Sequence, residues 1–399
     1  MVMFLSPKSF LLQISLRRNR LKRSSASFRS ASLHSGSRKA ASSFSGAYSS
    51  KRRRREHKKF LPEEVIGEIL LRLPVKSLLR FRCVSKSWHS LISSPLFAEL
   101  HFQRSPGRTH RILVTADSQF QSIDFNAPFH DDSAVVHLNF PRRRTPDDLE
   151  IMGSCRGFLL LVVDKQQKLF IWNPSNGVCR KIPPLNRNIF VYMYGFAYDE
   201  STDDYILVLV SDFLAFFSLK TKSWEILADE CQYIYQWDEP TSGSILNGAI
   251  HWFAKRVRQP PPECFTIIAF DIAAKNLREI PVPDDYEVGS GFLGVVGGCL
   301  TLTENSDVIK MWVMKEYGVK SSWTRLFTVS TNPCHIEFFQ PLCFTKDNQL
   351  VVRNSTIGLL KLSAKEELQV VDYLKFFRSP MSFACASVYT ETLLSLPSV

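Results

Sequence analysis

Residues 169–178 read LFIWNPSNGV: an apolar and aromatic run, a polar turn rich in Asn, Pro and Gly, and the opening of a second apolar run. This pattern predicts a short strand, a tight turn and a second strand. The same strand-turn-strand pattern recurs at residues 216–224, 268–277, 310–323 and 359–368. Between the residues that open each second strand, the spacings are 46, 53, 46 and 45 residues; those residues are Val178, Trp224, Leu277, Trp323 and Leu368. A strand repeat of roughly 40 to 50 residues is typical of β-propeller blades.

A second hairpin lies between successive repeats of this pattern. Its clearest instance is SILNGAIHW at residues 244–252, where Asn247-Gly248 between two apolar runs predicts a type I′ turn. Two hairpins in each period give four strands, the content of one blade. Five periods are visible, and residues 111–140 form a weaker sixth. We therefore expect a β-propeller of about six or seven four-stranded blades.

Residues 60–103 have a different pattern, that of short helices. Pro62 at a first helical position and Glu63 in the first turn favour a helix that Pro74 stops. A second helix is expected over residues 75–81, and a third after Ser85 as N-cap, ending before Pro95. The predicted fold class is therefore multidomain, α plus all-β, with a short three-helix unit before the propeller.

The first of these helices is apolar over a wide arc, with stripes formed by Val65 and Ile69 and by Ile66 and Leu70. A unit of about 45 residues is also smaller than most domains that are stable alone. Both features indicate that the helices bind a partner surface. The alternative is that the extra apolar face packs on the following domain.

Residues 1–59 are rich in Ser and Arg and contain 16 basic residues against one acid, Glu56. The rest of the chain then has 34 basic against 37 acidic residues, so the net charge of +12 belongs to this leader. We expect a disordered segment. It could be an inert solvated tail, a nuclear-import patch at 51–59, an organellar transit peptide at 1–50, or a nucleic-acid arm. We expect nucleus and/or cytoplasm, or an organelle if residues 1–50 are a transit peptide.

Other classes of function find little support in the sequence. No apolar run reaches the roughly 18 residues that a membrane span needs. The nine cysteines are scattered singly and predict buried thiols in a reducing compartment, and no His or Cys pair has metal-ligand spacing. The G-x-G-x-x-G match at residues 289–294 precedes a predicted strand instead of a helix, which argues against a nucleotide loop. We expect no cofactor, no metal and no catalytic residue; an active site at the central channel is the enzyme alternative.

Two parts of the chain resemble a known family. The pattern from Leu61-Pro62 to Pro74-Val75, followed by RCVSKSWHSLI at residues 82–92, resembles an F-box. Downstream, GSCRGFLL at 153–160, WNP at 172–174, YGFAYD at 194–199 and LNGAIHW at 246–252 resemble the F-box-associated domain of plant F-box proteins. The resemblance implies three regions: a basic leader at 1–59, an F-box at 60–103 and an F-box-associated propeller at 104–393.

The resemblance also implies a role. Such proteins are non-catalytic substrate-recognition subunits of Skp-cullin-F-box ubiquitin ligases: the F-box holds a Skp-type adaptor, which brings the cullin and RING subunits, and the propeller holds a protein target. Carried over by position, the adaptor contacts would be Leu61, Pro62, Ile66, Ile69, Leu70, Leu73, Pro74, Leu78, Val84 and Trp88. The alternative is a propeller scaffold outside any ligase.

Strand direction predicts where a target would bind. The turns between first and second and between third and fourth strands of a blade lie at one end of the ring, and the longer connections lie at the other. Long loops with aromatic and Arg side chains are typical of recognition surfaces. In the blade at 244–281 and the connection at 228–242 before it, the candidate target contacts are Tyr233, Tyr235, Trp237, Arg256 and Arg258. These aromatic rings could instead pack between blades.

Overall fold

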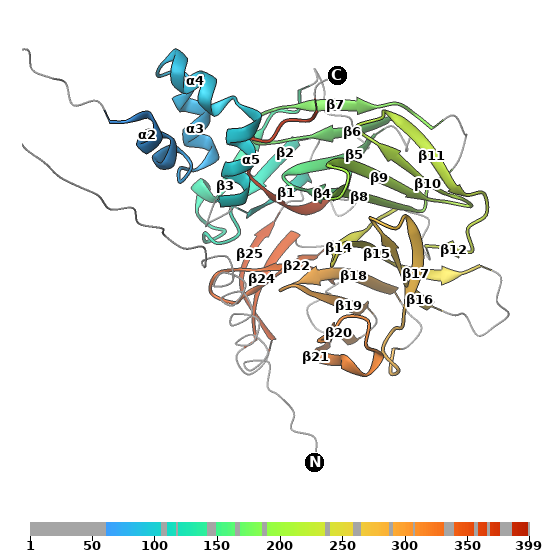
Figure 1. Ribbon diagram of the computed structural model, residues 1–399. Coiled ribbons are helices and arrows are strands. Elements are labelled where there is room, and N and C mark those ends of the chain that lie inside the picture. Colours follow the sequence, from blue (N-terminus) through green and yellow to red (C-terminus); the bar gives the residue numbers. More distant parts are fainter. Residues whose placement is uncertain are drawn as a thin grey trace, which may run out of the picture.

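The protein is described by a computed structural model of residues 61–104, 110–116, 119–141, 149–163, 168–185, 190–235, 240–257, 265–286, 290–305, 308–330, 339–354, 358–364, 368–375 and 385–397. The leader at 1–59 lies outside these residues, so its expected disorder remains a prediction. Within them, four helices precede six β-sheets arranged as the blades of a propeller (Figure 1).

The helices are α2 (Glu63–Leu70), α3 (Val75–Phe81), α4 (Lys86–Ile92) and α5 (Pro95–Arg104). Ser85 is the N-cap of α4, and its hydroxyl accepts a hydrogen bond from the backbone N–H of Trp88 at 3.1 Å. The expected count of three helices was wrong by one. Helix α4 stops before Pro95, and α5 begins at it. Proline disrupts the interior of a helix, but its fixed φ suits the first helical position.

Five blades are contiguous in the chain. Blade 2 contains β4 (Glu150–Cys155), β5 (Phe158–Val163), β6 (Lys168–Trp172) and β7 (Cys179–Ile182). Blade 3 contains β8 (Met193–Asp199), β9 (Asp204–Val210), β10 (Leu214–Ser218) and β11 (Ser223–Ala228). Blade 4 contains β14 (Ser244–Leu246), β15 (Ala249–Arg256), β16 (Phe265–Asp271) and β17 (Asn276–Ile280).

Blade 5 contains β18 (Ser290–Val296), β19 (Cys299–Asn305), β20 (Val308–Met314) and β21 (Trp323–Ser330), and blade 6 contains β22 (Phe339–Phe344), β23 (Leu350–Asn354), β24 (Gly358–Ala364) and β25 (Leu368–Lys375). Blade 1 joins the two ends of the chain: β26 (Ala386–Thr390), β1 (His110–Ala116), β2 (Gln119–Ile123) and β3 (Val135–Leu138). The remaining elements are short: β12 (Tyr233–Ile234), β13 (Thr241–Ser242), η1 (Asp132–Ala134) and η2 (Lys320–Ser322).

The repeat seen in the sequence corresponds to these blades. Each anchor residue lies within one position of the start of the fourth strand of a blade. The weak region at 111–140 supplies three strands of blade 1. The ring has six blades among the described residues, within the expected six or seven. Asn247 and Gly248 have φ values of 49° and 72°, which confirms the type I′ turn between β14 and β15. Gly291 and Gly294 lie on strand β18 itself, whereas the strand was expected to begin only after them; no helix follows, which agrees with the argument against a nucleotide loop.

Ring closure decides where the helices lie. Because β26 takes the innermost place in blade 1, the chain enters the ring at the second strand, with His110 of β1 opposite Thr390 of β26. The chain therefore enters and leaves at the end of the ring that carries the short hairpin turns, here called the short-turn face. The opposite end is here called the long-loop face: there the fourth strand of one blade ends and the first strand of the next begins, as with β7 and β8.

The segment after β26 is held by the WNPSN turn at residues 172–176 of blade 2. The side-chain amide of Asn173 donates to the carbonyl of Leu394 at 3.0 Å, and that of Asn176 donates to the same carbonyl at 2.8 Å. Leu393, Leu394 and Leu396 are buried in one apolar cluster with side chains of α2, α3 and α5 and of blades 2 and 3. The WNPSN turn of blade 2 therefore fixes the C-terminal segment at the junction of the helices and the ring.

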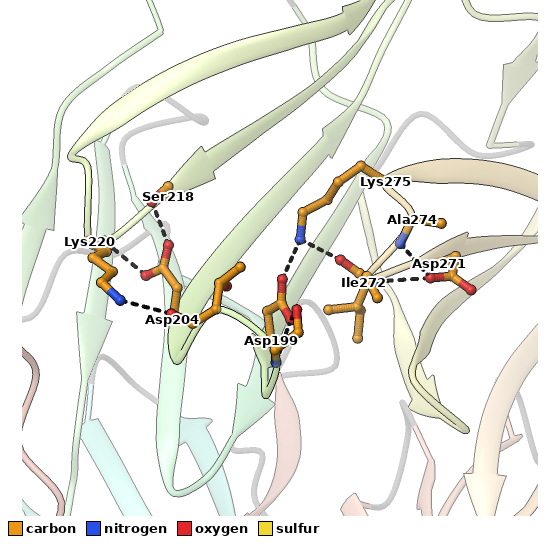
Figure 2. A network of polar contacts seen from close by, with 11 residues as sticks. Asp199, Asp204, Ser218, Lys220, Asp271, Ile272, Ala274 and Lys275 are labelled. Atoms are coloured by element: carbon orange, nitrogen blue, oxygen red, sulfur yellow. Dashed lines mark hydrogen bonds and ion pairs between the residues drawn. The ribbon is translucent and has the colours of Figure 1, made fainter.

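Polar side chains also tie blades 3 and 4 together at the short-turn face (Figure 2). Lys275, after β16, donates to the carboxylate of Asp199 at the end of β8 at 2.8 Å. Burial alone would raise the pKa of the Asp199 carboxyl, but hydrogen bonds from Lys275 and Ser201 hold that pKa well below its usual value. Within blade 3, Asp204 accepts hydrogen bonds from the Ser218 hydroxyl and from the backbone N–H of Lys220.

His251 of β15 links blade 4 to blade 5. Its Nδ1–H donates to the carbonyl of Ser244 at 3.0 Å, and its Nε2 accepts from the hydroxyl of Tyr317 at 2.6 Å. The same hydroxyl accepts from Arg278 at 2.6 Å. Burial lowers the pKa of His251 to about 4. The neutral ring is thus a structural hydrogen-bonding group in the fold.

This geometry predicts a pH dependence of stability. Because the pKa of His251 is lower in the folded state than the usual 6.5, the unfolded chain binds more protons between these values, and stability is lost as the pH falls through that window. Acidification from pH 7.5 to 4.5 should cost roughly 2 kcal/mol through this group. His251→Gln should remove that part of the pH dependence in urea unfolding, whereas the exposed His137→Gln should not. Equal pH profiles for the wild type and His251→Gln would contradict this role.

Candidate functional site

The helical unit exposes a set of apolar side chains that its own core does not use. Leu70 and Leu78 are fully buried, each with 0% exposure. By contrast, the exposed fractions are 58% for Leu61, 48% for Ile69 and 60% for Val84. Apolar side chains that remain in water on so small a unit are typical of a protein-binding surface. We call the exposed set of Leu61, Ile69 and Val84 the apolar docking surface.

The ten positions carried over from the F-box resemblance divide into three groups by burial. The exposed ones are Leu61, Pro62, Ile69, Pro74 and Val84. The partly buried ones, which pack against the core of the helices, are Ile66, Leu73 and Trp88. Leu70 and Leu78 are buried within that core, so in this conformation they support the surface instead of forming it. Their roles in binding are not tested by the fold and remain predictions.

Two more exposed apolar side chains belong to the same unit but were not among the ten positions. Val65 is 43% exposed and Leu96 is 70% exposed. Val65 could have been included from its i,i+4 spacing to Ile69. Leu96 lies in the first turn of α5, which the sequence analysis did not predict.

The five candidate target contacts lie in different environments. Tyr233 and Tyr235 are buried, each with 8% exposure, so their rings pack inside the propeller in this conformation. The region at 228–242 was expected to be one long loop, which was wrong: β12 pairs with β15, and β13 pairs with β8. Trp237 and Arg258 lie outside the described residues.

Arg256 belongs to a polar group that holds β12 against blade 4. Its Nε–H donates to the Glu279 carboxylate at 2.8 Å, and the hydroxyl of Tyr233 donates to the same oxygen at 2.7 Å. The hydrogen bond from Arg256 lowers the pKa of Glu279. These contacts give Arg256 and Tyr233 a structural role at the long-loop face, and their part in target binding stays a prediction.

The structure offers few features of other functional classes. Among the residues that the structure describes, no group of three or more His, Cys, Asp and Glu side chains is arranged to hold a metal ion. The described helices include none that is long and apolar enough to cross a membrane. Among the described cysteines, Cys83 is exposed, contrary to the expectation of buried thiols, whereas Cys155 and Cys299 are buried.

Comparison with known proteins matches both folded parts of the chain. Residues 60–100 match the F-box domain, and residues 111–394 match the F-box associated beta propeller domain. The chain is a plant F-box protein with an F-box-associated propeller. It is 30% identical to the F-box/kelch-repeat protein At3g23880 of Arabidopsis thaliana over 325 residues, which are 75% of this chain and 86% of that protein. It is 27% identical to the F-box protein CPR1 of Arabidopsis thaliana over 380 residues, which are 84% and 89% of the two chains.

Membership of this family fixes what kind of protein this is. F-box substrate-adaptor proteins are in general non-catalytic. Their F-box implies binding of a Skp-type adaptor. For this F-box protein, the two surfaces of interest are therefore the apolar docking surface and the long-loop face.

Proposed function

We propose that this F-box protein is the substrate receptor of a Skp-cullin-F-box ubiquitin ligase. The observation that carries the proposal is the apolar docking surface: Leu61, Ile69 and Val84 are about half or more exposed on an F-box whose own core is complete. Burying the exposed half of such a side chain in a complex stabilises the complex by roughly 1 to 1.5 kcal/mol. A Skp-type adaptor is the partner that the F-box implies.

The propeller would supply the second surface. The helices occupy the short-turn face, because α5 contacts the β4–β5 turn through Glu99 and Arg156. The long-loop face lies at the other end of the strands and is the better candidate for target binding. Its connections between blades can vary in sequence without disturbing the strands beneath them. Ubiquitin would then reach the target from an enzyme that the cullin and RING subunits bring.

The role as a receptor is tested by capture of targets in cells. The full-length chain and a variant with Leu61, Ile69 and Val84 all changed to alanine are purified by affinity from cells treated with proteasome and neddylation inhibitors. We expect the wild type to bring down the adaptor, the cullin and one or more target proteins, and the variant to retain the targets alone. If the variant lost the target proteins together with the adaptor, the assignment of target binding to the propeller would be contradicted.

A further inference from the structure

Arg156 joins the helical domain to two blades of the propeller. It lies in the two-residue turn between β4 and β5, at φ 49°, next to Gly157 at φ 84°. Both residues of a type I′ turn need positive φ, a conformation that non-glycine residues seldom adopt. The turn therefore holds the arginine side chain at the tip of the hairpin, facing the helices.

The guanidinium of Arg156 has partners on both sides. It forms an ion pair with Glu99 of α5 and lies over the ring of Phe102 in the same helix, with 4.9 Å to the ring centroid. Its other neighbour is Tyr198 of β8, at 3.9 Å to the ring centroid. Only 16% of the arginine side chain is exposed, so solvent screens these contacts less than it would on an open surface. A planar guanidinium can stack on rings and pair with a carboxylate at once, which an ammonium cannot.

The ring on the propeller side is itself fixed. The hydroxyl of Tyr198 donates a hydrogen bond to the Asp203 carboxylate, across the β8–β9 turn. Burial, followed by that hydrogen bond, raises the pKa of Tyr198 to about 12, so the hydroxyl remains a donor at neutral pH. Arg156 therefore lies between helix α5 and a tyrosine of blade 3 whose own hydroxyl is hydrogen-bonded.

Chain connectivity alone does not set the orientation of the helices. Five residues, 105–109, separate α5 from β1, and five extended residues can span roughly 17 Å. The C-terminal segment packs on the same turn: a Cβ on Gly157 would lie 2.1 Å from Cγ2 of Thr392. The helices thus rest on a junction made of the β4–β5 turn and the segment after β26.

We propose that Arg156 is the positioning residue that fixes the orientation of the F-box on the propeller. The proposal rests on the receptor function proposed above, and in that setting Arg156 sets the direction in which a target on the long-loop face is presented to the rest of the ligase. Orientation of reacting groups contributes strongly to transfer reactions, so a residue far from the target surface can control ubiquitin transfer.

The orientation can be measured on the full chain with spin labels. One label is attached to the exposed Cys83 of the F-box and the other to a cysteine introduced as Ser223→Cys on β11, with Cys83→Ser samples for background. Pulsed electron resonance then gives the distribution of distances between them. We expect a narrow distribution for the wild type and at least a twofold broadening for Arg156→Ala, with Arg156→Lys in between.

Two further variants separate positioning from stability. Arg278→Ala is a matched control, since Arg278 lies over the ring of Tyr317 at 5.2 Å but contacts no helix, and it should leave the distribution narrow. Glu99→Gln removes the ion pair while Arg156 stays, and it should broaden the distribution less than Arg156→Ala. An unchanged width in Arg156→Ala, or equal broadening in Arg278→Ala, would overturn the proposal. Failure of the wild type to bind the adaptor would instead overturn the receptor function.

Discussion

Replacing Leu61, Ile69 and Val84 together with alanine is expected to weaken binding of a Skp-type adaptor by at least a hundredfold. The three side chains are about half exposed in the free chain, so burying the exposed parts contributes together roughly 3 to 4 kcal/mol, and each 1.4 kcal/mol is about a factor of ten. All three are exposed in the free chain, so the melting temperature should change by no more than a few degrees. Calorimetric titration with purified adaptor, together with thermal unfolding, measures both quantities.

A matched control exists on the propeller. Ile226, Val257 and Val319 are exposed to 38%, 46% and 42%, and their combined change to alanine removes similar side chains from a surface that the adaptor is not expected to touch. Adaptor affinity should be unchanged in this control. If both triple variants lost affinity equally, or the F-box variant lost none, the claim that the adaptor binds the apolar docking surface would be contradicted.

Removing residues 391–399 is expected to unfold the protein or make it insoluble at 25 °C. Truncation of a buried leucine typically costs about 2 to 5 kcal/mol, and three are lost here, whereas whole domains are stable by about 5 to 15 kcal/mol. The deletion also leaves the buried Asn173 amide without the carbonyls of Thr392 and Leu394. Expression in the soluble fraction and circular dichroism test this result.

A single substitution keeps this prediction measurable in a folded protein. Leu394→Ala should lower the melting temperature by roughly 5 to 10 °C, on the basis of about 2 to 4 °C per kcal/mol in large domains. The neighbouring Ser395→Ala changes an exposed side chain and should have little effect. A soluble truncated chain with the melting temperature of the wild type would show that the C-terminal segment does not stabilise the junction.

The blades could be predicted from sequence because their signals are local. Asn247 and Gly248 specify a turn by their own backbone preferences, and the spacing of such turns is the period of the ring. Helix α5 was missed because Pro95 is compatible with both the end of one helix and the start of another. Local rules cannot decide between these two outcomes when only two residues, Ser93 and Ser94, separate the helices.

The surfaces were harder to predict because burial depends on distant parts of the chain. Tyr233 has the composition of a recognition residue, but its hydroxyl is held by Glu279, 46 positions away. The hydrogen bond from Asn173 to the carbonyl of Leu394 joins residues 221 positions apart. The WNPSN motif by itself predicts only a turn, so it could not show this contact. The same difficulty applies within the F-box. Leu70 and Leu78 are buried and Ile69 is exposed, but the apolar pattern of the sequence does not distinguish core residues from surface residues.

The central claim, that this chain is an adaptor-binding receptor, is tested most directly by titrating the full-length wild type with a purified Skp-type adaptor. We expect one adaptor per chain, a dissociation constant in the micromolar range or tighter, and a negative heat-capacity change from burial of apolar surface. A folded chain that gives no heat of binding, and no complex in size-exclusion chromatography at tens of micromolar, would contradict the account.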